Sequence, residues 1–111
     1  MSIDDREGRK LSAITKVQGR LATSDQAAAM EHHNRIVDAL IPRTKELGGT
    51  GHMVFANVAD PMEFLAIDAW DAVESIQKFM GDPAVQAEVG AMFDGPPDVM
   101  VWVPREGWRQ F

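Results

Sequence analysis

Among the side chains of this sequence, three histidines and one aspartate are the best suited to acid–base chemistry. His33 falls on the apolar side of a helix that the residue pattern predicts over about residues 25–47, so it points toward the interior. Imidazole changes its charge near neutral pH and can therefore serve as a general base. Two interpretations of His33 stay open: a catalytic base or substrate-binding group, and a buried neutral imidazole with one satisfied hydrogen bond.

Asp68 lies in a predicted strand, on the same face as Phe64 and Trp70. A carboxylate on a buried face needs a partner, and His33 across the interior is a candidate. Such a pair would hold the imidazole in one tautomer and raise its basicity. Alternatively, Asp68 accepts hydrogen bonds from backbone amides at the start of the next helix. Asn57, near a predicted hairpin turn, could donate to a substrate oxygen, although asparagines at turns are usually structural.

We expect no metal site from the histidines. His32 and His33 are neighbours on the predicted helix and point about 100° apart. His52 follows the end of that helix, whereas His33 precedes the end by about three to four turns, at about 1.5 Å per residue. The sequence thus places His33 and His52 far apart within one subunit, with His52 at a strand end in solvent or at a dimer contact. His32 is expected to be half exposed, and a site that spans two subunits stays open.

The composition is typical of one soluble globular domain. The chain has 111 residues, of which 45% are hydrophobic and 25% charged, and a formal net charge of -6. The negative charge argues against nucleic acid and anionic membrane surfaces as partners. Neither a signal peptide nor an apolar run of the roughly 20 residues that a membrane helix needs is expected. The absence of cysteine excludes disulfides and thiolate metal sites and fits a reducing, cytoplasmic location.

The elements that must position these residues follow the order β-α-β-β-α-β, the ferredoxin-like α+β arrangement with a four-stranded antiparallel sheet. Thr23 with Gln26 predicts a capping box at the start of the first helix, with Ser24 as an alternative cap. Pro42 predicts a kink within this helix, or else an end near Ile41 and a restart, and Gly48 with Gly49 predicts its end. Asp71 with Glu74, and then Asp82 before Pro83, predict two further helix starts. Strands are predicted over residues 11–21, 50–58, 63–70 and 99–103, and the second helical region over residues 71–93.

One face of the predicted sheet meets the helices, and the other face is also apolar. Leu65, Ile67 and Ala69, with Met100 or Val101, should lie on the face away from the helices. A soluble monomer rarely leaves such a patch open, so we expect a homodimer. The predicted organisation is a flexible N-terminal arm over residues 1–9, a single ferredoxin-like domain over residues 10–104 and a tail over residues 105–111. The tail carries Trp108 and Phe111 and should dock on the partner subunit or at the pocket.

The stretch Asp68-Ala69-Trp70-Asp71-Ala72-Val73-Glu74 resembles the acidic-x-Trp signature of the dimeric α+β barrel superfamily, with antibiotic-biosynthesis-monooxygenase-like proteins as the closest members. Residues 79–83 and 99–102 are similar to that superfamily as well. The resemblance implies a homodimer with a pocket between helices and sheet in each subunit. It implies that Trp70 lines this pocket, and we expect Phe64 and Trp102 to bind substrate with it. Residues 71–93 contain no histidine, which argues against the haem-degrading branch, and the absence of tyrosine excludes a tyrosine–histidine pair of the cyclase type.

Together these observations favour a small enzyme. The hypothesis is a cofactor-independent monooxygenase that acts on an apolar aromatic or polyketide-like small molecule, with His33 as base, Asp68 as its orienting group and Trp70 as a pocket wall. No cofactor is expected, because an electron-rich substrate can reduce oxygen itself. Two alternatives remain: a non-catalytic protein of the same fold that binds a hydrophobic ligand or serves as a dimeric assembly module, and an isomerase or cyclase.

Overall fold

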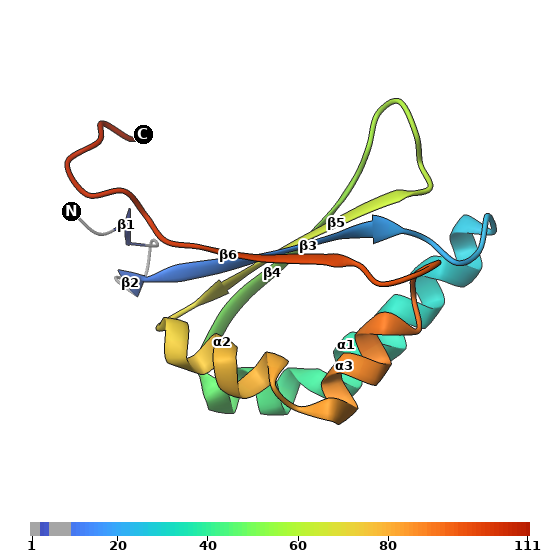
Figure 1. Ribbon diagram of the computed structural model, residues 1–111, viewed down its shortest axis with the longest axis horizontal. Helices are drawn as coiled ribbons and strands as arrows, with labels where there is room; N and C mark the ends of the chain where they lie inside the picture. The colour runs from blue at the N-terminus through green and yellow to red at the C-terminus, as the bar shows by residue number, and fades with distance from the viewer. Residues whose placement is uncertain (1–2, 5–9) are drawn as a thin grey trace.

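The computed structural model describes residues 3–4 and 10–111 and contains a single helical layer packed on one side of a sheet (Figure 1). Its strands and helices, in chain order, are β1 Ile3–Asp4, β2 Lys10–Leu11, β3 Ala13–Arg20, α1 Gln26–Leu47, β4 Gly49–Ala56, β5 Glu63–Trp70, α2 Val73–Met80, α3 Pro83–Gly90 and β6 Asp98–Trp102.

The main sheet has four strands in the order β4-β5-β3-β6, and all neighbouring pairs are antiparallel. Helices α1, α2 and α3 lie on one side of it, so the predicted ferredoxin-like α+β fold is confirmed (Figure 1). Of the predicted N-terminal arm, only the short pairing of β1 with β2 is described, and the rest lies outside the described residues. Within the described part of the chain, no helix is both long and apolar enough to cross a membrane.

Helix α1 is one continuous helix, and its start differs in detail from the prediction. The cap is Asp25, whose side chain accepts a hydrogen bond from the backbone N–H of Ala28 at 3.1 Å. Thr23 instead accepts from the backbone N–H of Asp25 at 3.2 Å, so the capping box predicted from Thr23 was wrong. The helix continues through Pro42 and ends at Gly48, as predicted. A long α1 therefore spans the sheet and carries one wall of the candidate site.

The second helical region is two short helices, and only the second start was predicted correctly. Helix α2 has Ala72 at its cap position, and alanine has no polar side chain to cap it. The carboxylate of the preceding Asp71 accepts instead from the Ser75 hydroxyl at 2.7 Å. Helix α3 begins as expected: Asp82 accepts from the backbone N–H of Ala84 at 2.9 Å and Pro83 occupies the first helical position.

Gly48 joins α1 to β4 in a conformation that side chains disfavour. Its φ is 111°, and an added Cβ would collide with the carboxylate of Asp71. A Gly48→Ala change should therefore lower the free energy of unfolding by about 1–2 kcal/mol or more, because alanine is strained in a left-handed backbone and its Cβ would collide with Asp71. Gly90 is the matched control, since its φ is not positive and no atom lies within 4 Å of a Cβ there. Gly90→Ala should leave the free energy of unfolding unchanged or raise it. Urea denaturation of the wild type and both variants measures these changes.

The sheet face away from the helices carries a band of apolar side chains. Leu65, Ile67 and Ala69 alternate on β5 with residues that pack against the helices. On β6, Met100 pairs in register with Lys16, which also pairs with Ile67, so Met100 shares this face. Val101 pairs with the buried Thr15 and lies on the other face, which settles the alternative left open by the sequence. Large exposed side chains complete this open face: Met53, Phe55, Met100 and Trp102.

The C-terminal tail leaves β6 and runs beyond the sheet, on the side opposite the helices (Figure 1). Trp108 is 63% exposed, and the guanidinium of Arg105 sits 5.3 Å from the centroid of its ring. Phe111 is fully exposed. In a single subunit, the aromatic side chains of the tail are therefore exposed.

Candidate functional site

A cavity of about 360 Å³ lies between α1 and the sheet, and its walls are mostly apolar. Ile36, Val37, Leu40 and Ile41 from α1 form one wall, and Phe79 and Val89 close it from α2 and α3. The polar side chains that reach the cavity are few, and they gather on the sheet side and on α1: His33, Thr44, Lys45, Thr50, His52 and Asp68. A mostly apolar pocket with a few convergent polar groups is the usual form of a small-molecule site.

A chain of hydrogen bonds starts in the core and ends at this cavity. The indole N–H of Trp70 donates to the hydroxyl of Thr15 at 3.2 Å, and that hydroxyl donates to Oδ2 of Asp68 at 3.2 Å. Trp70 and Thr15 are each 1% exposed, so the bond between them is buried, whereas the bond to Asp68 is only partly buried. The other carboxylate oxygen, Oδ1, contacts Nδ1 of His52 at 2.5 Å.

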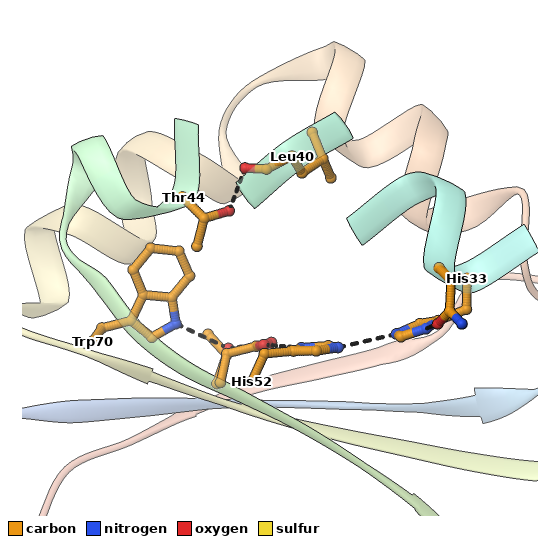
Figure 2. Close-up of polar contacts among 8 residues, drawn as sticks. His33, Leu40, Thr44, His52 and Trp70 are labelled. Atoms are coloured by element: carbon orange, nitrogen blue, oxygen red, sulfur yellow. Dashed lines mark hydrogen bonds and ion pairs between the residues drawn. The ribbon is translucent and has the colours of Figure 1, made fainter. Parts of the chain in front are cut away.

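The chain continues across the cavity to α1. Nε2 of His52 lies 3.0 Å from Nε2 of His33, and Nδ1 of His33 lies 2.9 Å from Oδ1 of Asn34. Trp70, His52 and His33 therefore lie in a row beneath α1, with the Thr44–Leu40 hydrogen bond on the far side of the space (Figure 2). Side chains from β3, β4, β5 and α1 thus meet in one connected network.

The expectation that His33 and His52 lie far apart in one subunit was wrong. Strand β4 runs back along α1 directly after Gly48 and advances about 3.3 Å per residue. By His52 the chain has therefore run back along α1 over a large part of the distance that separates His33 from the end of the helix. The two imidazole side chains bridge what is left. His52 also pairs in register with Asp68 on β5, which places the two side chains on the same face of the sheet.

The geometry of the histidine pair fits a proton better than a metal ion. The ring planes differ by 16° and the centroids are 5.1 Å apart, so the two Nε2 atoms lie head to head on the line between the rings. A metal at the usual Zn–N distance of about 2.0–2.1 Å from both nitrogens would have to sit well to one side of that line. In the described residues, no group of three or more histidine, cysteine, aspartate or glutamate side chains is placed to hold a metal ion.

The structure brings together four of the six residues predicted for the site. His33, Asp68, Trp70 and Phe64 all line the cavity. Asn57 and Trp102 do not line it. The amide oxygen of Asn57 accepts from the backbone N–H of Ala59 at 2.8 Å, as turn asparagines do.

Trp102 belongs to the open face, because it pairs with Ile14 in the register of β3 and β6. The side chains of Ala13 and Thr15, on either side of Ile14, are buried on the helical side, so Trp102 points away from the cavity.

Sequence reasoning missed His52 and Thr15 as members of this network. The signal for both was period-two alternation: Thr15 pairs with Asp68 on one side of β5, and His52 pairs with Asp68 on the other. Asp68 lies on β5, between β3 and β4, so Thr15 and His52 flank it on its two sides. Direct contact between Asp68 and His33 was expected, but His52 stands between them.

A second hollow of about 420 Å³ lies on the other side of His33, toward the loop between β4 and β5. His33, Phe64 and Met92 border both spaces. Near this loop, Arg20 binds Asp60 at 3.0 Å and Glu63 at 3.6 Å. The hydrogen bond from Arg20 lowers the pKa of Asp60, and Asp60 in turn raises the pKa of Arg20. This ion pair belongs to the loop and lies outside the cavity.

Neither a protein-family model nor a curated protein matches the chain. Solved structures do match it, over most of their length. A conserved protein of Methanosarcina mazei Go1 is 11% identical with a TM-score of 0.67, covering 86% of this chain and 95% of that one. A Nitrosomonas europaea protein named as an antibiotic biosynthesis monooxygenase is 14% identical with a TM-score of 0.66, covering 87% and 93%.

A third match is a monooxygenase from the gene ActVA-Orf6 of Streptomyces coelicolor, in complex with the ligand nanaomycin D. It is 15% identical with a TM-score of 0.66, covering 91% of this chain and 94% of that one. At these identities the likeness shows a shared backbone fold and carries no information about the side chains of the site. The chain therefore has the ferredoxin-like α+β fold of proteins that are named as antibiotic biosynthesis monooxygenases.

Proposed function

We propose that this protein is a cofactor-independent monooxygenase that oxidises an apolar, electron-rich aromatic molecule in the cavity beneath α1. The observation that carries the proposal is the His33–His52–Asp68 chain set into an otherwise apolar wall. Such a wall excludes water and orients an aromatic ring, while the imidazoles supply a base. The fold shared with named monooxygenases supports the same reaction class.

The proposed reaction converts a phenol and dioxygen into a quinone and water. His33 takes the phenolic proton, and the phenolate passes one electron to dioxygen to give a ring radical and superoxide. These combine through a new C–O bond, and the peroxide takes a proton. Loss of the ring hydrogen as a proton, with cleavage of the O–O bond, leaves a C=O group on the ring and releases water. One oxygen atom ends in the product and the other in water, so dioxygen accepts the four electrons that the phenol loses.

The polar network favours an enzyme over a passive binding protein. A binding pocket for an apolar ligand is expected to hold apolar side chains, with any histidine bonded to backbone. Here the contacts of both His33 nitrogens are with side chains, and Asp68, which is 22% exposed, sits on the cavity wall. Placing a carboxylate and two imidazoles beside an apolar space has a desolvation cost that ligand binding alone does not require.

We further propose that the protein works as a homodimer joined through the open face, and that the tail of residues 105–111 docks on the partner. Leu65, Ile67, Met53, Phe55 and Met100 form an apolar band that a second copy would cover. None of the residues 105–111 lines the cavity, which favours docking on the partner over a lid on the same subunit. Trp108, at 63% exposure, gains from such a contact.

Oxygen uptake by the purified protein tests the reaction. A panel of two- and three-ring phenols, incubated with the protein and air, should include at least one that gives the quinone with one O₂ consumed per product and no hydrogen peroxide released. Uptake should persist after dialysis against a chelator and without added flavin. If ligands of this class bind to the cavity but no oxygen is consumed above the blank, the binding-protein alternative holds.

A further inference from the structure

We propose that His33 and His52 hold one proton between their Nε2 atoms and act as a single acid–base unit, whose protonation is set from the protein core by Trp70, Thr15 and Asp68. The inference deepens the proposed function, since it concerns the same cavity. It assigns His52 as a second catalytic residue, and Thr15 as a positioning residue that touches no ligand.

The direction of the chain is fixed at its buried end. An indole nitrogen can only donate, so the Trp70 N–H forces the Thr15 oxygen to accept. The Thr15 hydroxyl proton is then left for Oδ2 of Asp68. Between Asp68 and His52 the proton resides on nitrogen, because an imidazole is a stronger base than a carboxylate. His52 therefore carries its proton on Nδ1 and turns Nε2 toward His33.

The contact between the rings requires one further proton. Two bare Nε2 lone pairs would repel each other at 3.0 Å head to head, so a proton lies between them. In the state in which the Asn34 amide oxygen faces Nδ1 of His33, that nitrogen carries a proton as well. The two rings then share three protons and one positive charge, which the negative charge of Asp68 balances.

The pair can lose a single proton without leaving a polar atom unpaired. If the amide of Asn34 turns over, its NH₂ donates to Nδ1 of His33, while the proton between the Nε2 atoms and the proton on Nδ1 of His52 stay in place. Asn34 is exposed on α1 and has room for this rotation. The network thus has two fully bonded states that differ by one proton, as a reversible acid–base group needs.

The surroundings contain few other charges that could perturb this exchange. Lys45 of α1 lines the same cavity, and Glu63 of β5 borders the outer hollow beside His33 and Asn34. The side chains that α2 and α3 turn toward the cavity, Phe79 and Val89, are apolar. A ligand hydroxyl that takes the place of the Asn34 amide at Nδ1 of His33 can exchange one proton with the pair. The site should therefore favour ionisable hydroxyl compounds such as phenols over apolar molecules of equal size.

Nitrogen NMR of the ligand-free protein, labelled with ¹⁵N in histidine, tests the shared proton directly. In the wild type, long-range ¹H–¹⁵N spectra should show His52 protonated on Nδ1 and the rings of His33 and His52 losing one proton in a single joint step as the pH rises. His32 serves as the independent reference, because it has no place in the network. Two rings that titrate separately, or His52 protonated only on Nε2, would overturn the proposal.

Variants at Thr15 test the control from the core. Thr15→Val removes the hydroxyl that donates to the Asp68 carboxylate, so the pH at which the pair loses its proton should rise. Thr15→Ser keeps the hydroxyl and should behave as the wild type. An unchanged midpoint in a folded Thr15→Val protein would remove Thr15 from the proposal, and the wild-type spectra decide the shared proton even if that variant does not fold.

These measurements separate the inference from the proposed function. A shared proton in a protein that consumes no oxygen would support the acid–base unit and reject the monooxygenase. Oxygen uptake in a protein whose histidines titrate independently would support the monooxygenase and reject the unit.

Discussion

Replacing His33 with glutamine should lower kcat for oxygen uptake by about 10²–10⁴-fold, the usual contribution of a positioned general base. Glutamine can still hydrogen-bond to Nε2 of His52, so the cavity keeps its shape, but it cannot accept a substrate proton at neutral pH. KM should change little, because the apolar walls that hold the substrate are untouched. Steady-state oxygen-electrode kinetics on the best substrate of the phenol panel measure both quantities.

The control is His32→Gln, one residue away on α1. His32 does not line the cavity, so this variant should keep wild-type kcat. His52→Gln should match the loss in His33→Gln, and the double variant should lose little more, because residues that act as one unit are not additive. Equal rates in wild type and His33→Gln would contradict the assignment of the base.

The fold was predictable because each element carries a local signal. β5 was predicted over Glu63–Trp70 and occupies those residues, since its alternating large side chains and the turn before it leave little choice. The end of α1 at Gly48 was equally predictable, because glycine readily adopts the left-handed conformation that ends a helix. Cap positions were less predictable: Asp25 and Thr23 are both good caps two residues apart, and only the path of the chain decides between them.

The site was predictable in part. Asp68, Trp70 and His33 could be placed on inward faces from periodicity alone. The position of His52 could not, because it depends on how far β4 runs back beneath α1, a tertiary distance that no local pattern sets. Thr15 was missed because a threonine in a strand is unremarkable until its neighbours are known.

A charge placed on the open face should separate the proposed dimer. Ile67 pairs directly with Lys16 across β5 and β3, and both side chains lie on the face that we expect a second copy to cover. Ile67→Lys would put two ammonium groups side by side in an apolar interface, where their repulsion is poorly screened and their desolvation is costly. It would also remove a large side chain whose burial contributes about 1.5–3 kcal/mol per subunit.

Light scattering at low micromolar concentration should therefore give a dimer for the wild type and a monomer for Ile67→Lys. Ala87→Lys is the matched control: it adds the same charge on an exposed position of α3 and should remain dimeric. The apolar band left open in the monomer should also make Ile67→Lys more prone to aggregate than the control. A wild-type protein that stays monomeric at these concentrations would contradict the dimer, since Met53, Phe55 and Trp102 would then face water in the working protein.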